Sequence, residues 1–178
     1  MSLINLLDYG SVLIFAITGA LVASRAQLDL VGFAFIASLT ALGGGTIRDL
    51  LLDRNPIFWI DNPTYLAVAG AAALAVFFSA HLLESRYRTL IWLDSFALAI
   101  AVAAGAAVAI GQDQTAVIVI LMGMIPGCMG GLMRDVVVGQ VPLILKQGEL
   151  YATAAFAGAA AAATGRHFGL DPLLSLSA

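Results

Sequence analysis

Six apolar stretches, each close to the length of a helix that crosses a bilayer, dominate this sequence. They lie at residues 6–23, 30–51, 63–83, 90–110, 115–138 and 149–164. A transmembrane helix needs about 20 mostly apolar residues, and the lipid core admits backbone only in helices or closed barrels. The stretches lack the two-residue alternation that barrel strands show. We therefore predict an all-α integral membrane protein that forms a single membrane domain over residues 1–178.

The composition excludes the common soluble classes of protein. Hydrophobic residues make up 61% of the 178 residues and charged residues 11%, whereas a soluble domain carries about 25% charge. The sequence has no basic face of the kind that binds nucleic acid. It also lacks a phosphate-binding loop, a zinc-ligand spacing and a Ser-His-Asp set. We therefore expect no enzyme activity, no catalytic residue and no metal site.

The second half of the chain repeats the first at a constant offset of 86 residues. Repeat 1 covers about 5–84, repeat 2 covers about 91–165, and a C-terminal segment follows at 166–178. Each repeat contains three spans, so the second must enter the membrane from the opposite side, which gives an inverted-topology repeat. The matched positions that are hardest to explain by chance are Asp8/Asp94, Gly44-Gly45/Gly130-Gly131, Arg48-Asp49/Arg134-Asp135 and Pro56/Pro142.

Lysine and arginine residues in the short loops indicate the orientation, because positive charge is enriched on the cytoplasmic side. One side of the predicted topology holds four such residues, namely Arg25, Arg86, Arg88 and Lys146. The other side holds two, Arg54 and Arg166. We therefore expect the first side to be cytoplasmic and the N-terminus to be external.

Glycine clusters lie near the middle of the second and fifth spans. They comprise Gly43, Gly44 and Gly45 with Thr46 in the second span, and Pro126, Gly127, Gly130 and Gly131 in the fifth. A helical glycine costs roughly 1 kcal/mol relative to alanine, and proline removes a backbone hydrogen bond. We predict that both helices kink or unwind at the membrane centre and leave free carbonyls along a water-filled path. The alternative is that the glycines only allow close helix packing.

An Arg-Asp dipeptide follows each glycine cluster, as Arg48-Asp49 and Arg134-Asp135. Charged side chains inside a membrane are costly and must face the protein interior, water or each other. Adjacent helical residues point about 100° apart, which disfavours pairing within each dipeptide. We therefore predict that Arg48 pairs with Asp8 and Arg134 with Asp94, one pair toward each mouth of a pore. Two roles are compatible with the sequence, a structural clamp between helices and a pore-lining gate.

With these motifs, the chain resembles the prokaryotic members of the trimeric intracellular cation (TRIC) channel family. The resemblance rests on residues 43–49 and 130–135 and on the three-plus-three layout of spans. It implies a homotrimer in which each protomer has its own pore, formed between the second and fifth spans and permeable to monovalent cations, chiefly K⁺.

The same resemblance carries further expectations about location and ligands. It implies a prokaryotic plasma (inner) membrane, a cytoplasmic C-terminus and a seventh helix that begins near Leu170 and would be truncated at Ala178. We expect no cofactor besides the permeant K⁺ or Na⁺, with bound lipid as an optional ligand. The expected partners are the lipid bilayer, the other protomers of the trimer and monovalent cations, with no nucleic acid.

Two other functions compete with a channel. One is an alternating-access carrier of a small neutral solute such as glycine, and the other is a membrane scaffold that transports nothing. A channel predicts unitary current steps, a carrier predicts slower and saturable uptake, and a scaffold predicts neither.

Overall fold

The computed structural model describes residues 3–80, 86–145 and 151–167. Its elements are α1 (Leu3–Arg25), α2 (Leu30–Leu51), α3 (Phe58–Asp61), α4 (Thr64–Ser79), α5 (Arg86–Gly111), α6 (Ala116–Val137), the short 3₁₀ helix η2 (Leu143–Leu145) and α7 (Tyr151–His167). Every regular element in these ranges is helical, which confirms the predicted all-α fold. The seventh helix expected near Leu170 falls within 168–178, outside the described residues.

Four helices are long and apolar enough to cross a membrane, namely α1, α2, α5 and α6. The helices α4 and α7 are shorter apolar helices, and the spans predicted at 63–83 and 149–164 each extend into residues outside the described ranges. Large apolar side chains point outward from the bundle, for example Val31, Phe78 and Trp92, which are 75%, 69% and 64% exposed. Such a surface is stable against lipid rather than water.

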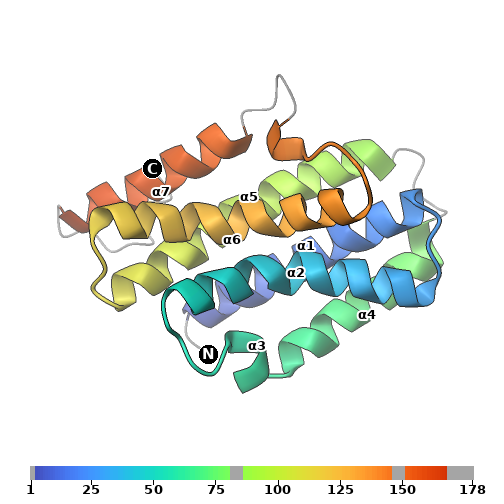
Figure 1. Ribbon diagram of the computed structural model, residues 1–178, viewed down its shortest axis with the longest axis horizontal. Coiled ribbons are helices and arrows are strands. Elements are labelled where there is room, and N and C mark those ends of the chain that lie inside the picture. Colours follow the sequence, from blue (N-terminus) through green and yellow to red (C-terminus); the bar gives the residue numbers. More distant parts are fainter. Residues whose placement is uncertain (1–2, 81–85, 146–150, 168–178) are drawn as a thin grey trace.

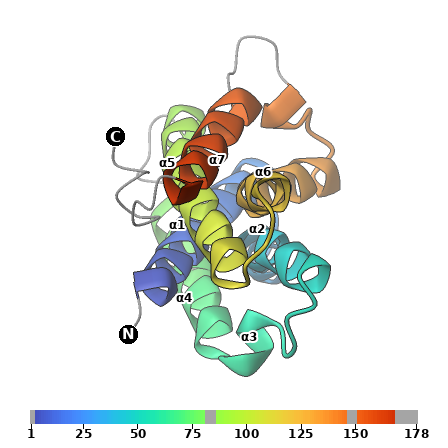
Figure 2. The ribbon, with the colours of Figure 1, turned by 90° about the vertical axis from the view of Figure 1, so that its left-hand side faces the viewer.

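The helices α1, α2, α5 and α6 form a central bundle (Figure 1). The helix α4 packs against α1 and α2, and α7 packs against α5 and α6, so these two helices lie on opposite sides of the bundle (Figure 2). The colours of Figure 1 show that α1 and α5 run in opposite directions, as do α2 and α6. This arrangement supports the inverted repeat, because the first two helices of repeat 1 each have an oppositely directed counterpart in repeat 2.

Glycines at matched positions let the first two helices of each repeat approach closely. A Cβ added at Gly19 of α1 would lie 2.8 Å from the carbonyl oxygen of Ile36 in α2. A Cβ added at Gly105 of α5 would overlap the carbonyl oxygen of Met122 in α6. Positions 19 and 105, like 36 and 122, are 86 residues apart. The two halves therefore use the same close contact, which small residues permit between membrane helices.

The sequence predicts that the second and fifth spans kink or unwind; the unwinding does not occur, and the kink stays a prediction. The helix α2 is continuous from Leu30 to Leu51, and α6 is continuous from Ala116 to Val137 with Pro126 inside it. Glycine keeps its N–H and can donate the helical hydrogen bond, and packing against neighbouring helices offsets its low helix propensity. Pro126 removes a single bond. An unwound segment is therefore not present to line a path with free carbonyls.

Candidate functional site

The helices α2 and α6 cross at two glycines of the predicted clusters. Gly44 lies against the backbone of Pro126, where an added Cβ would overlap the Pro126 carbonyl oxygen. Gly130 lies against the carbonyl oxygen of Thr40 in the same way. The two contacts are equivalent in the repeat, because position 44 matches position 130 and position 40 matches position 126 at the 86-residue offset. Close packing, the alternative considered from the sequence, thus accounts for these two glycines.

The other glycines of the clusters face several different parts of the protein. Added Cβ atoms would approach the side chains of α3, α5 and α6 rather than one common lining. These contacts are Gly43 with Met133, Gly45 with Phe58, Gly127 with Leu98, and Gly131 with Asp94 and Arg134. The clusters therefore serve separate helix contacts around the crossing.

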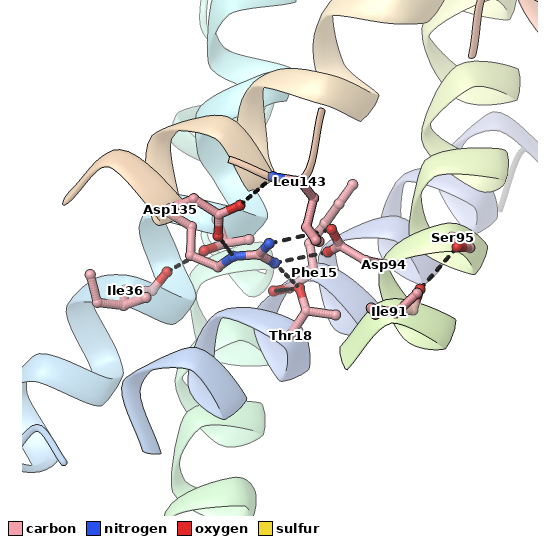
Figure 3. A network of polar contacts seen from close by, with 10 residues as sticks. Phe15, Thr18, Ile36, Ile91, Asp94, Ser95, Asp135 and Leu143 are labelled. Atoms are coloured by element: carbon pink, nitrogen blue, oxygen red, sulfur yellow. Dashed lines mark hydrogen bonds and ion pairs between the residues drawn. The ribbon is translucent and has the colours of Figure 1, made fainter. Parts of the chain in front are cut away.

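Arg134 lies at one end of this crossing in a polar network, of which Thr18, Asp94, Asp135 and Leu143 are labelled in Figure 3. Its side chain is completely buried. Its Nη1 donates to Asp94 Oδ1 at 2.8 Å and to Thr18 Oγ1 at 3.1 Å, and its Nη2 donates to Asp94 Oδ2 at 3.3 Å. The predicted pair of Arg134 with Asp94 is thus present as a two-bonded contact, and Thr18 ties the network to α1.

Arg48 lies at the other end and is 2% exposed. Its Nη1 donates to Asp8 Oδ1 at 3.1 Å, so the predicted pair of Arg48 with Asp8 is also present. This pair has one hydrogen bond rather than two, and the Asp8 side chain is 13% exposed. Within the described part of the chain, Arg48 Nη2 is buried without a hydrogen-bond partner. Both arginines therefore pair with an aspartate at the matched position, but Arg48 makes fewer hydrogen bonds to its partner than Arg134 does.

The prediction that adjacent Arg and Asp residues do not pair is wrong. In both dipeptides the arginine Nε donates to Oδ1 of the next residue at 2.8 Å, because the long side chain folds back along the helix end. The second carboxylate oxygen of each aspartate accepts a hydrogen bond from the backbone that follows the helix. Asp49 Oδ2 accepts from the Phe58 N–H, and Asp135 Oδ2 accepts from the Leu143 N–H, both at 3.0 Å. Asp49 and Asp135 therefore link the arginines to the loops that follow α2 and α6.

The two ends differ in charge balance. Asp49 Oδ1 also accepts from Arg54 Nη1 at 3.1 Å, so the Arg48 end holds two guanidinium groups and two carboxylates. The Arg134 end holds one guanidinium group and the carboxylates of Asp94 and Asp135. Among the ion pairs of the described residues, the first end is neutral and the second carries a net charge of −1.

The sequence interpretation missed two partners in these networks. Thr18 lies 116 residues from Arg134, and a single threonine in an apolar helix carries no signal of its role. Arg54 follows Asp49 by five residues in the loop after α2, and from the sequence it bears only on the orientation. Its closeness in the chain to Asp49, at the end of the span, is the sequence feature that indicates this contact.

Thr46 faces α3 rather than a path between α2 and α6. Its Oγ1 accepts from Trp59 Nε1 at 2.9 Å and donates to the Leu42 carbonyl oxygen at 2.7 Å. We expect Trp59→Phe to lower the free energy of unfolding by about 1 kcal/mol, because it removes one partly buried hydrogen bond. The measurement is thermal unfolding in detergent. Trp92→Phe is the control, since Trp92 is 64% exposed; equal losses in both variants would contradict this assignment.

Comparison with known proteins begins with a family model described as Glycine transporter. It matches residues 5–81 and, a second time, residues 91–167. The two matches start 86 residues apart, which is the offset found between the halves of the sequence. The double match therefore supports the internal duplication.

Relatives of the chain are membrane proteins. It is 38% identical over 163 residues to a UPF0126 membrane protein of Vibrio cholerae, which covers 88% of this chain and 66% of that relative. It is 36% identical over 179 residues to the UPF0126 inner membrane protein YadS of Escherichia coli, with 98% and 84% covered. The chain thus spans slightly less than two thirds of the first relative's length.

A solved structure matches the fold along nearly the whole chain. It is that of the TRIC trimeric intracellular cation channel orthologue from Rhodobacter sphaeroides, with a TM-score of 0.95 and 42% identity. The match covers 99% of this chain and 91% of the other. That relative is a channel rather than an enzyme, and its fold is the one described above.

Proposed function

The chain belongs to the family described as Glycine transporter and shares its fold with a TRIC cation channel, and from this premise we propose that it conducts monovalent cations, chiefly K⁺, across the membrane. The proposed assembly is a homotrimer with one pore in each protomer. The proposed location is the inner membrane of a prokaryote, with an external N-terminus and a cytoplasmic C-terminus. The E. coli relative, which is named an inner membrane protein, supports this location.

The proposed path follows the seam between α2 and α6. Its two ends carry the buried arginine networks, and its middle is the glycine crossing. Gly44 against the Pro126 backbone and Gly130 against the Thr40 backbone leave no room between the helices, so the seam is closed here in this conformation. Conduction therefore requires α2 and α6 to separate at these contacts, which makes the crossing a gate rather than a ring of free carbonyls.

The observation that carries the choice of a cation is the charge of the Arg134 end. Among the ion pairs of the described residues, two carboxylates, Asp94 and Asp135, face one guanidinium group there, so acidic groups outnumber basic groups by one in a buried site. Rings of acidic groups favour cations in pores. The Arg48 end is neutral because Arg54 balances Asp49, so it presents no opposing barrier of net positive charge.

A carrier of a small neutral solute such as glycine is the second candidate. The description of the matching family model favours it. A closed crossing between two polar ends also suits alternating access, in which each end opens in turn around a central site.

Reconstitution into planar lipid bilayers with a KCl gradient tests the two candidates. A channel gives discrete current steps whose reversal potential lies near that of K⁺. A carrier gives no steps but shows saturable uptake of glycine into liposomes. The Trp92→Phe variant, changed at an exposed apolar position, should behave as the unmodified protein. Current steps that reverse at the chloride potential would overturn the proposal of a cation path.

A further inference from the structure

The two arginine networks differ at one matched position of the repeat. Thr18 of α1 places its hydroxyl against Arg134 Nη1 at 3.1 Å and donates to the Phe15 carbonyl oxygen at 2.9 Å. The position 86 residues further on is Ala104 of α5, which is 1% exposed. Alanine has no hydrogen-bonding group, so the Arg48 network lacks the hydroxyl that completes its counterpart.

A small cavity of about 20 Å³ lies at this place. Ala104 lines it together with Arg48, Asp8, Ser11 and Ala101, the last of which matches Phe15 in the repeat. Arg48 Nη2 is the buried side-chain nitrogen or oxygen atom that the described residues leave without a partner. The absent hydroxyl, the cavity and an unsatisfied guanidinium N–H therefore all belong to the Arg48 network.

We propose that this cavity binds a single water molecule, which accepts a hydrogen bond from Arg48 Nη2 and fills the space that the short side chain of Ala104 leaves open. The matching Arg134 Nη2 donates to Asp94 Oδ2, so the water supplies the second acceptor that Asp8 does not provide. The volume suits one water and no larger solute. A buried water needs two to four polar partners, and the Asp8 carboxylate and the Ser11 hydroxyl also line the cavity. A charged donor left unpaired away from water is costly, which gives the site its affinity.

The consequence is that one end of the repeat is hydrated and the other is dry. The Asp8 side chain is 13% exposed, so water reaches the Arg48 network past it. The Asp94 side chain is 1% exposed and accepts two bonds from Arg134, and among the described residues no buried nitrogen of Arg134 lacks a hydrogen-bond partner, so that network needs no water. This inference is independent of whether the protein is a channel or a carrier.

Two nearly isosteric substitutions at position 104 test the water site. Ala104→Thr adds a hydroxyl that displaces the water and pairs with Arg48, whereas Ala104→Val displaces the water and offers no partner. We expect the unfolding temperature of the threonine variant to exceed that of the valine variant by about 2–4 °C. Ala104→Ser against Ala104→Cys repeats the comparison with a smaller added group, in case the branched residues prevent folding. A valine or cysteine variant as stable as its hydroxyl counterpart would overturn the proposal.

The position of the water is tested by high-resolution crystallography of the full chain. Density is expected within hydrogen-bond distance of Arg48 Nη2 in the unmodified protein and is expected to vanish in Ala104→Thr. Thr18→Ala should create the matching site, with new density beside Arg134 Nη1. A map that shows other buried waters but none at Arg48 Nη2 would refute the site.

Discussion

Replacing Arg134 by methionine is expected to lower the free energy of unfolding by about 3–5 kcal/mol. Methionine fills much of the same space but leaves the carboxylates of Asp94 and Asp135 without a counter-charge, and these residues are 0% and 3% exposed. A buried charge that loses its partner keeps its full desolvation cost. Since folded domains are stable by only about 5–15 kcal/mol, the variant should give little folded protein. The measurements are the unfolding temperature and the yield of monodisperse protein in detergent.

Arg48→Met is the matched control for this prediction, and its loss should be smaller. Asp49 would retain its ion pair with Arg54 at 3.1 Å, and Asp8 is partly exposed and can be solvated. A second substitution, Asp94→Leu, should recover part of the stability lost in Arg134→Met, because it removes the stranded carboxylate. Equal losses at the two arginines, or no recovery in the double variant, would show that Arg134 is not the clamp that its contacts suggest.

The arginine pairs could be predicted from the sequence because the same spacing of aspartate and arginine occurs in both repeats. A single pair of residues so far apart in the chain would give no indication that they are in contact. Asp8 and Arg48 are far apart, but their offset is the same as that of Asp94 and Arg134. An apolar run between charged or polar residues also predicted α2 at its observed bounds, Leu30–Leu51. In both cases the membrane limits the alternatives, since it forces helical backbone and buries charge.

The function of the glycines could not be predicted in the same way. A low helix propensity at Gly44 is equally consistent with a broken helix and with a close crossing, and the choice depends on what packs against it. The Pro126 backbone packs against Gly44, and this contact depends on the tertiary structure. The role of the Thr18 hydroxyl could not be predicted from the repeat, because the matched position holds Ala104, which has no hydroxyl.

Adding a single methyl group at the crossing is expected to destabilise the protein, although alanine is the better helix former. In Gly44→Ala the Cβ would overlap the Pro126 carbonyl oxygen, and neither backbone can move without separating α2 from α6. Such overpacking costs about 1–3 kcal/mol, against a gain of up to about 1 kcal/mol in helix propensity. At Gly70 of α4 an added Cβ meets nothing within 4 Å, so Gly70→Ala should be neutral or stabilising. Thermal unfolding of both variants compares the two effects.

The double variant Gly44→Ala/Gly130→Ala tests whether the crossing acts as one unit. Both glycines belong to the same contact between α2 and α6, so a separation that accommodates the first methyl group also makes room for the second. The combined loss should therefore be smaller than the sum of the two single losses, as expected for residues that share a backbone shift. Additive losses in the free energy of unfolding would mean that the backbone shifts independently at the two glycine contacts. A gate that opens by separating the two helices requires the coupled result, because both contacts must then break together.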